Sequence, residues 1–458
     1  MIPAVIERCA GIDVGKKLVA VCVMVGTADG EPRVERRMFG TFNAELERLR
    51  QWLASEGCTH AVMESTGSYW KPLHAVLEKS VEVIVANGED VKPRKGHKTD
   101  WKDCQWLAHL LRHGMIRASF IPPGGIRELR DLTRRRKQLL KAATAERNRV
   151  QKVLEEANVK LGSVLSDVFG VSGQFMLEAL LEGKASVEQI ADMARRRARQ
   201  KIPEIIQSLE GHRMTDHQRR LIRMSLDHLA FLEKQIQQLD DLILSQIEQE
   251  GYQPQFELLQ SVPGLAPDSA ASILAEIGPN MEQFPTAGHL SSFAGVCPGN
   301  NRSAGKSKGS HTVRGNKWLR TALVECAWAA AAKKDCFLKD KYWRLAAGKQ
   351  KEGRKKALVA VAHLVLVLIY RTISSGRAYQ ERGAIELSEA KRERLIQHHI
   401  RRLGRLGIAV CSARPARAKL PPQPRVNPEA KMVFLDQKSA KRTQGGAKPS
   451  RNKKMKAT

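Results

Sequence analysis

The sequence predicts an α/β domain, then a mostly helical chain, then a basic tail. Strand-like and helix-like segments alternate up to residue 123, helical periodicity follows, and from Ser412 onward thirteen Lys and Arg are interleaved with Pro and Gly. That tail composition is typical of disorder. The chain of 458 residues has room for several domains, and we predict boundaries at 1–123, 124–250, 251–375 and 376–458.

The first 123 residues contain five strand-like segments. "AGIDVGKKLVAVCVMVG" and "RVERRMFGTF" supply three, "HAVMEST" (60–66) a fourth and "VEVIVAN" (81–87) a fifth. Helical patterns occupy 44–55, 68–79 and 100–113. Three strands, then helix, strand, helix, strand and helix is the order of an RNase H-like domain.

Two long helical stripes dominate the middle of the chain. The first follows a heptad spacing with two polar interruptions: Leu129, Leu132, Arg136, Leu139, Ala143, Glu146, Val150 and Val153. The second begins after a predicted N-cap at Thr215 and contains Leu229, Leu232, Ile236, Leu239 and Ile243. The stripes can pair as a coiled-coil hairpin within one chain or as a dimer arm between chains, or they reflect plain helix packing.

The charge of the chain favours a polyanionic partner. There are 77 Lys and Arg against 48 Asp and Glu, a formal net charge of +29. Nucleic acid is favoured over a membrane, because no signal peptide is evident and the apolar run 357–370 is short enough to be a buried helix. Eight cysteines without a C-x-x-C pair indicate a reducing, cytoplasmic setting.

Four carboxylates occupy positions typical of a metal centre. Asp13 ends the first predicted strand and Glu64 the fourth, while Asp100 and Asp103 begin a helix three residues apart. If the two strands are neighbours, the four acids converge, and a cluster of that kind suits Mg²⁺ or Mn²⁺. Two such ions about 4 Å apart can hold the attacking and leaving oxygens of a phosphodiester. Taken singly, each acid can equally be a turn or helix-capping residue.

Two basic segments are candidates for phosphate contacts. One precedes the acidic pair and includes Lys95 and Lys98. The other runs from Gly299 to Arg320 and contains no acid but six cations: Arg302, Lys306, Lys308, Arg314, Lys317 and Arg320. Part of it, "GNNRSAGKS", resembles a phosphate-binding P-loop, but its first glycine is one place early and no strand leads into it. Ser303 is therefore either a turn residue or a nucleophile, and no local base is apparent.

The segment 258–278, "LLQSVPGLAPDSAASILAEIG", resembles a helix-hairpin-helix. A V-P-G-L turn separates two predicted helices, the second opening with Pro267 and Asp268. Turns of this kind present backbone N–H groups to DNA phosphates without reading sequence.

Several motifs together resemble one family. They are "GIDVGKK", "MESTGSYW", "KTDWKDCQWLAHLL", "DVFGVSG", "FAGVCPGNNRSAGK", "RGNKWLRTALVECAWAA" and "KKALVAVAHLVL". In this order they are similar to the transposases of the insertion sequence 110 family over about residues 8–405. The resemblance implies a RuvC-like N-terminal domain, a coiled coil and a C-terminal transposase domain.

The resemblance also implies the chemistry. The family's four acids match Asp13, Glu64, Asp100 and Asp103, and its DNA-attacking serine, which forms a phosphoserine link, matches Ser303. The family further implies double-stranded donor and target DNA, a structured guide (bridge) RNA, and a site shared between subunits of a homodimer or homotetramer. Many relatives have two serines in this loop, whereas this chain has Arg302-Ser303-Ala304, which leaves one candidate.

Two rival functions stay open on the sequence alone. A RuvC-like nuclease or Holliday-junction resolvase would use the carboxylates and leave Ser303 as a turn residue. A packaging protein without catalysis is supported only by the charge.

Overall fold

The computed structural model describes residues 3–88, 91, 99–299, 302–303, 306–307, 311–348, 350–381 and 389–406. The chain divides into two compact units, 1–385 and 386–458. Helix α16 (Glu389–Arg405) is the described part of the second unit. The basic tail expected to be disordered lies outside the described residues, as do Lys95, Lys98 and Lys308.

The first unit begins with the five-stranded sheet that the sequence predicts. Its strands are β1 (Arg8–Val14), β2 (Leu18–Val25), β3 (Arg33–Gly40), β4 (His60–Glu64) and β5 (Glu82–Ala86). They lie in the order β3-β2-β1-β4-β5. Strands β1 to β3 are antiparallel, β4 runs parallel to β1, and β5 runs parallel to β4. An α/β N-terminal domain is confirmed.

Both faces of the sheet are covered. Side chains alternate between the two faces of a strand, and both sets are buried in β2. On one face Val19, Val21 and Val23 belong to one hydrophobic core. On the other face Ala20, Cys22 and Met24 belong to a second core. The first core holds buried residues of α1 (Asn43–Ser55) and α2 (Trp70–Leu77), and the second those of α3 (Asp100–Arg112). Helix α3 therefore lies alone on one face, and its first turn carries two of the predicted acids.

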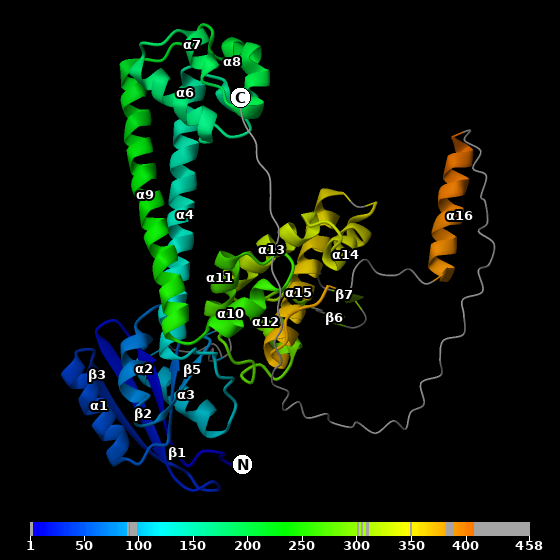
Figure 1. Cartoon of the computed structure of the whole chain (residues 1–458). Helices are drawn as coiled ribbons and strands as arrows, with labels where there is room; N and C mark the ends of the chain where they lie inside the picture. The colour runs from blue at the N-terminus through cyan, green and yellow to red at the C-terminus, as the bar shows by residue number, and fades with distance from the viewer. Residues whose placement is uncertain are drawn as a thin grey trace, which may run out of the picture. The chain divides into compact units, whose positions relative to one another are not determined.

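The two long stripes form an antiparallel hairpin within the chain. Helices α4 (Gly124–Glu156) and α9 (Asp216–Gln249) lie side by side in Figure 1. Arg136 pairs with Asp240, and Arg147 lies 2.8 Å from Glu233. The residue numbers rise along α4 as they fall along α9, so the two helices are antiparallel. These contacts explain the two polar residues in the heptad. Arg136 is paired with Asp240 on α9. Glu146 accepts a hydrogen bond from His228 Nδ1 at 2.8 Å if that ring nitrogen is protonated.

Short helices join the C-terminus of α4 to the N-terminus of α9 (Figure 1). They are α5 (Leu161–Val164), α6 (Val171–Glu182), α7 (Val187–Asp192), the 3-10 turn η1 (Arg196–Lys201) and α8 (Ile202–Leu209). Their common core includes Met176 and Ile205. The predicted N-cap is confirmed, because Thr215 and Gln218 form a reciprocal capping box at the start of α9.

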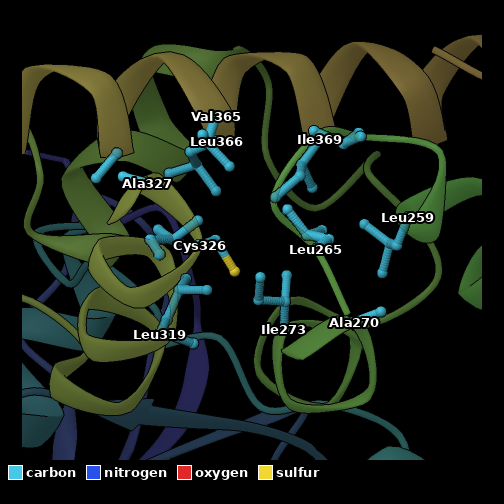
Figure 2. Packing of buried hydrophobic residues seen from close by; sticks show 14 of the residues in the cluster. Leu259, Leu265, Ala270, Ile273, Leu319, Cys326, Ala327, Val365, Leu366 and Ile369 are labelled. Atoms are coloured by element: carbon cyan, nitrogen blue, oxygen red, sulfur yellow. The ribbon is translucent and has the colours of Figure 1, made fainter. Parts of the chain in front are cut away.

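The rest of the unit is helical: α10 (Gln253–Gln260), α11 (Pro267–Ile277), α12 (Ala287–Ala294), α13 (Lys317–Ala332), α14 (Phe337–Ala346) and α15 (Lys351–Ser375). By length and composition alone α15 could cross a membrane. Figure 2 instead shows its Val365, Leu366 and Ile369 packed toward residues of α11 and α13. The expected buried helix over 357–370 is confirmed.

The segment 258–278, which resembles a helix-hairpin-helix in sequence, contains the end of α10, a turn and α11. Gly264 has φ +90°, and a Cβ there would lie 2.4 Å from the backbone oxygen of Cys326 in α13. Val262 and Leu265 are buried. The turn therefore packs closely on α13, and its contact with DNA phosphates stays a prediction.

Candidate active site

Asp13 and Glu64 lie at corresponding positions on neighbouring strands. Strands β1 and β4 are paired up to Ile12 and Met63, and the two acids follow directly in each strand. Both carboxylates are half-buried. Because the strands are parallel, both acids stand at the same edge of the sheet. The sequence-based expectation that these strands are adjacent is confirmed.

A glycine allows α3 to lie directly on β1. A Cβ at Gly11 would fall 2.1 Å from the backbone oxygen of Cys104 and 2.3 Å from the backbone nitrogen of Ala108. No side chain fits in that space, so the close approach depends on glycine at this position. The contact lies two residues from Asp13 on the strand and one from Asp103 on the helix.

The first turn of α3 is fixed by its N-cap. The Thr99 hydroxyl accepts a hydrogen bond from the backbone N–H of Lys102 at 3.3 Å. The pKa of the Cys104 thiol is raised by a hydrogen bond with Cys22 and by burial, and the negative charge of Asp13 adds to this shift. The influence of Asp13 therefore reaches the helix residue next to Asp103. Asp100, one turn earlier, is exposed.

The acids do not form a closed cluster. Among the described residues, no group of three or more His, Cys, Asp or Glu is close enough to hold a metal ion. The convergence of all four acids around a cation therefore stays a prediction. The Glu64 carboxylate instead lies against Gly88, where a Cβ would come 2.2 Å from Oε1. The donors are nevertheless carboxylate oxygens, which suit a hard divalent cation.

Gly11→Ala is expected to destabilise the protein and to weaken the site. The new methyl group meets backbone atoms of α3, which cannot rotate away, so the helix must shift, at a cost of about 1–3 kcal/mol or more. Urea unfolding of the variant measures this loss. Gly162→Ala is the control, because its Cβ would meet only Val168 Cγ2 at 3.9 Å. Equal midpoints for the two variants would show that the close approach at Gly11 is unimportant.

The second candidate segment is closed at its base by backbone contacts. Gly299 donates from its N–H to the His311 carbonyl at 2.9 Å, and Pro298 and Thr312 form an antiparallel bridge. Below this bridge Gly295 and Gly315 touch, since a Cβ on Gly315 would lie 2.4 Å from the Gly295 nitrogen. These glycines permit a close crossing of the two ends of the segment.

Ser303 belongs to a very short hairpin. Strands β6 (Arg302–Ser303) and β7 (Lys306–Ser307) are antiparallel, with Ser303 opposite Lys306 and Arg302 opposite Ser307. The sequence predicts a basic segment here, and the strand pairing adds to that prediction. Ser303 is therefore the last residue of the first hairpin strand. The structure describes the backbone of these four residues.

The other predicted basic contacts lie where the hairpin returns to the helical core. Arg314 and Lys317 are exposed, and Arg320 is half-buried on the first turn of α13. All three lie after the base of the hairpin, and Lys317 and Arg320 are in the first turn of α13. Cationic residues are therefore present at the start of α13, directly after the hairpin.

A buried acid links the start of α13 to α4. Glu276 of α11 is 2% exposed. It accepts hydrogen bonds from Arg134 at 2.7 and 2.9 Å and from the Asn316 side chain at 2.6 Å. Asn316 is also the N-cap of α13, accepting from the backbone of Trp318 and Leu319. Arg130 completes the group 3.4 Å away, and burial lowers its pKa while Glu276 opposes that shift.

Two family models match separate parts of the chain. Residues 10–159 match a model of DEDD transposases of IS110, and residues 256–343 match the IS116/IS110/IS902 family of transposases. The chain belongs to the IS110 family of transposases. The first range contains Asp13, Glu64, Asp100 and Asp103, and the second contains Ser303.

A curated relative agrees with this placement. The chain is 30% identical over 141 residues to a Streptomyces coelicolor protein named "Insertion element IS110 uncharacterized 43.6 kDa protein". The similarity covers 30% of this chain and 33% of that protein. The similarity thus spans about a third of the relative's length.

Sequence reasoning missed the network around Glu276 in this IS110-family chain. One signal was present, since Glu276 is a single acid in the otherwise apolar run "AASILAEIG". No local pattern around Arg134 or Asn316 indicates that their side chains meet this acid. A lone acid among apolar residues indicates a buried charge that needs a partner.

Proposed function

We propose that this chain is a transposase that cuts and rejoins the DNA strands of a bacterial insertion sequence. The observation that carries the proposal is the placement of Asp13 and Glu64 on adjacent parallel strands, with the helix of Asp103 held over them at Gly11. These residues fall within the range matched by the DEDD transposase model. The overall charge of +29 suits a nucleic-acid substrate.

In this proposal Asp13, Glu64, Asp100 and Asp103 hold Mg²⁺ or Mn²⁺. A bound divalent ion supplies charge stabilisation to the oxygens of a phosphodiester undergoing displacement. The carboxylates act as ligands. Thr99 and Gly11 are positioning residues, because they fix the helix that carries two of the four acids.

Ser303 is the proposed nucleophile. Its Oγ attacks phosphorus and loses its proton, the bond from phosphorus to the deoxyribose oxygen breaks, and that oxygen takes up a proton. The energy of the broken bond is kept in a serine–DNA phosphodiester, so a later attack by a DNA hydroxyl rejoins strands. The cationic residues Arg302, Lys306, Lys308, Arg314, Lys317 and Arg320, with Lys95 and Lys98, are proposed to contact DNA or RNA phosphates.

Partners follow from the same proposal. A structured non-coding RNA selects donor and target DNA by base pairing, so that the protein needs to read little sequence itself. The chain works as a homodimer or homotetramer, in the bacterial cytoplasm at the nucleoid. The family membership supports a DNA substrate, and the RNA and the assembly are the finer parts of the proposal.

One observation favours a second candidate function. Ser303 stands directly before the reversal of a hairpin, where a serine also serves as a turn residue. A metal-dependent RuvC-like nuclease would then cut without a covalent intermediate. The products separate the two, because a nuclease leaves free ends and a recombinase yields rejoined strands. Sequencing of the products made by the full chain with its RNA and both DNA partners tests the proposal.

Binding to DNA is expected to fall steeply as salt rises, because each Lys or Arg contact releases counterions from phosphate. Deleting residues 412–458, which contain thirteen Lys and Arg against two acids, should lower the affinity and the salt slope. The choice of target should stay the same, since base pairing makes it. Fluorescence anisotropy at several salt concentrations measures the first effect, and insertion-site sequencing measures the second. Altered target choice after truncation would mean that the tail reads sequence.

A further inference from the structure

A cavity of about 240 Å³ lies between α4, α11 and α13. Its lining combines an aromatic ring, cations, acids and hydroxyl groups, among them Trp318, Lys141, Lys317, Asp268, Ser272 and Thr321. The volume is below the roughly 300–1,000 Å³ of pockets for drug-sized ligands. A single planar ring system with a charged substituent is the kind of ligand that fits.

Most charges in this cavity are already paired. Arg134 binds Glu276, Lys137 lies 2.6 Å from Glu325, and Arg136 lies 3.5 Å from Asp268. Lys141 and Lys317 differ, because neither forms an ion pair with a carboxylate anywhere in the described residues. Both are exposed, so an incoming anion can reach them.

These two cations lie over one aromatic ring. The ammonium groups of Lys141 and Lys317 lie 5.7 and 5.8 Å from the centre of the Trp318 ring, and the Arg134 guanidinium lies 5.5 Å away. Trp318 itself is half-buried and lines the cavity. Aromatic rings beside cations are the usual platform for unpaired bases, because the ring stacks on the base and the cations bind the phosphate.

We propose that this cavity binds one unpaired nucleotide of a nucleic-acid strand, with the base on Trp318 and its phosphate between Lys141 and Lys317. The carboxylate of Asp268 and the hydroxyl oxygens of Ser272 and Thr321 are acceptors for the base edge or sugar. The proposal deepens the proposed function, since it assumes a nucleic-acid partner. An unpaired nucleotide bound here would distort the nucleic-acid strand next to α13, the helix that follows the Ser303 hairpin.

Equilibrium binding in the presence of a metal chelator tests this site without any cleavage. The probes are a DNA duplex and an RNA duplex, each with one bulged 2-aminopurine, and the fully paired version of each. Trp318→Leu should weaken binding of a bulged probe about tenfold, as expected for one lost stacking contact, and leave paired probes unaffected. The 2-aminopurine fluorescence should be quenched by the wild-type chain and not by the variant.

Trp328→Leu is the matched control, because Trp328 is on the same helix, is 56% exposed and does not line the cavity. It should bind all probes as the wild type does. Trp318→Tyr should keep most of the preference for the bulge, which separates stacking from a folding defect. Lys141→Gln should lower the salt slope for bulged probes by about one.

A preference for the bulged DNA or the bulged RNA, lost in Trp318→Leu alone, supports the site and tells which strand supplies the nucleotide. Equal effects of Trp318→Leu and Trp328→Leu, or equal losses for bulged and paired probes, would overturn it. Because chelated protein is used, this outcome is independent of whether Ser303 and the carboxylates perform strand transfer.

Discussion

Replacing Asp13 by Asn is expected to abolish DNA strand cleavage and to leave nucleic-acid binding nearly unchanged. The substitution keeps the size of the side chain but removes one ligand charge beside Glu64, and the cation site then loses affinity. The basic surfaces are elsewhere, so binding should persist. Cleavage of labelled DNA in Mg²⁺, compared with filter binding in chelator, measures the two effects separately.

Asp29→Asn is the matched control for this loss, because Asp29 is exposed in the connection between β2 and β3 and carries the same charge. It should cleave as the wild type does. Asp103→Asn should behave like Asp13→Asn, since its helix is held over β1 at Gly11. Full recombination by either active-site variant would refute the metal centre.

Replacing Ser303 by Ala is expected to remove strand transfer below detection while RNA and DNA binding stay within about twofold, because one hydroxyl adds little to an interface dominated by phosphate contacts. Ser307→Ala is the control, since Ser307 lies in the opposing strand of the same hairpin. Product gels with donor and target DNA report the reaction. Retained strand transfer in Ser303→Ala, or its loss in Ser307→Ala alone, would show that Ser303 is not the nucleophile.

The variants Asp13→Asn and Ser303→Ala together test whether the active site is shared between subunits. Neither Asp13→Asn nor Ser303→Ala should react alone. If carboxylates and serine come from different subunits, mixing the two proteins should restore part of the activity. Restoration requires each chain to contribute the group that the other lacks.

Much of the N-terminal domain could be predicted, because its strands and helices follow from local, periodic patterns of apolar residues. In β2, Val19, Val21 and Val23 are buried in one core and the residues between them are buried in the other. That pattern, with helical segments between strands, gives the element order. The adjacency of β1 and β4 follows from the order, and with it the shared edge of Asp13 and Glu64.

The hairpin of α4 and α9 was only partly predictable. The apolar stripes indicate two long helices, but a stripe does not tell whether its partner is in the same chain. The answer depends on long-range pairs such as Arg136 with Asp240 and Glu146 with His228, which no local window of sequence reveals. Those pairs also explain why the heptad tolerates two polar residues.

The site details that were missed depend on tertiary contact. Gly11 reads as an ordinary strand glycine until α3 is placed on top of it. The hairpin containing Ser303 has strands of two residues, too short for any periodic pattern to show. Glu276 and Asn316 meet across separate helices, and their joint role in anchoring α13 follows only from the 2.6 Å contact between them.

The most direct test of the account is to map the covalent protein–DNA adduct. The wild-type chain with its RNA is stalled on nicked DNA in Mg²⁺, digested, and analysed by mass spectrometry for a peptide carrying a nucleotide. The account predicts the adduct on Ser303, none on Ser307 or Ser310, and none at all from Asp13→Asn despite its intact serine. An adduct on another residue, or cleaved DNA with no adduct, would contradict it.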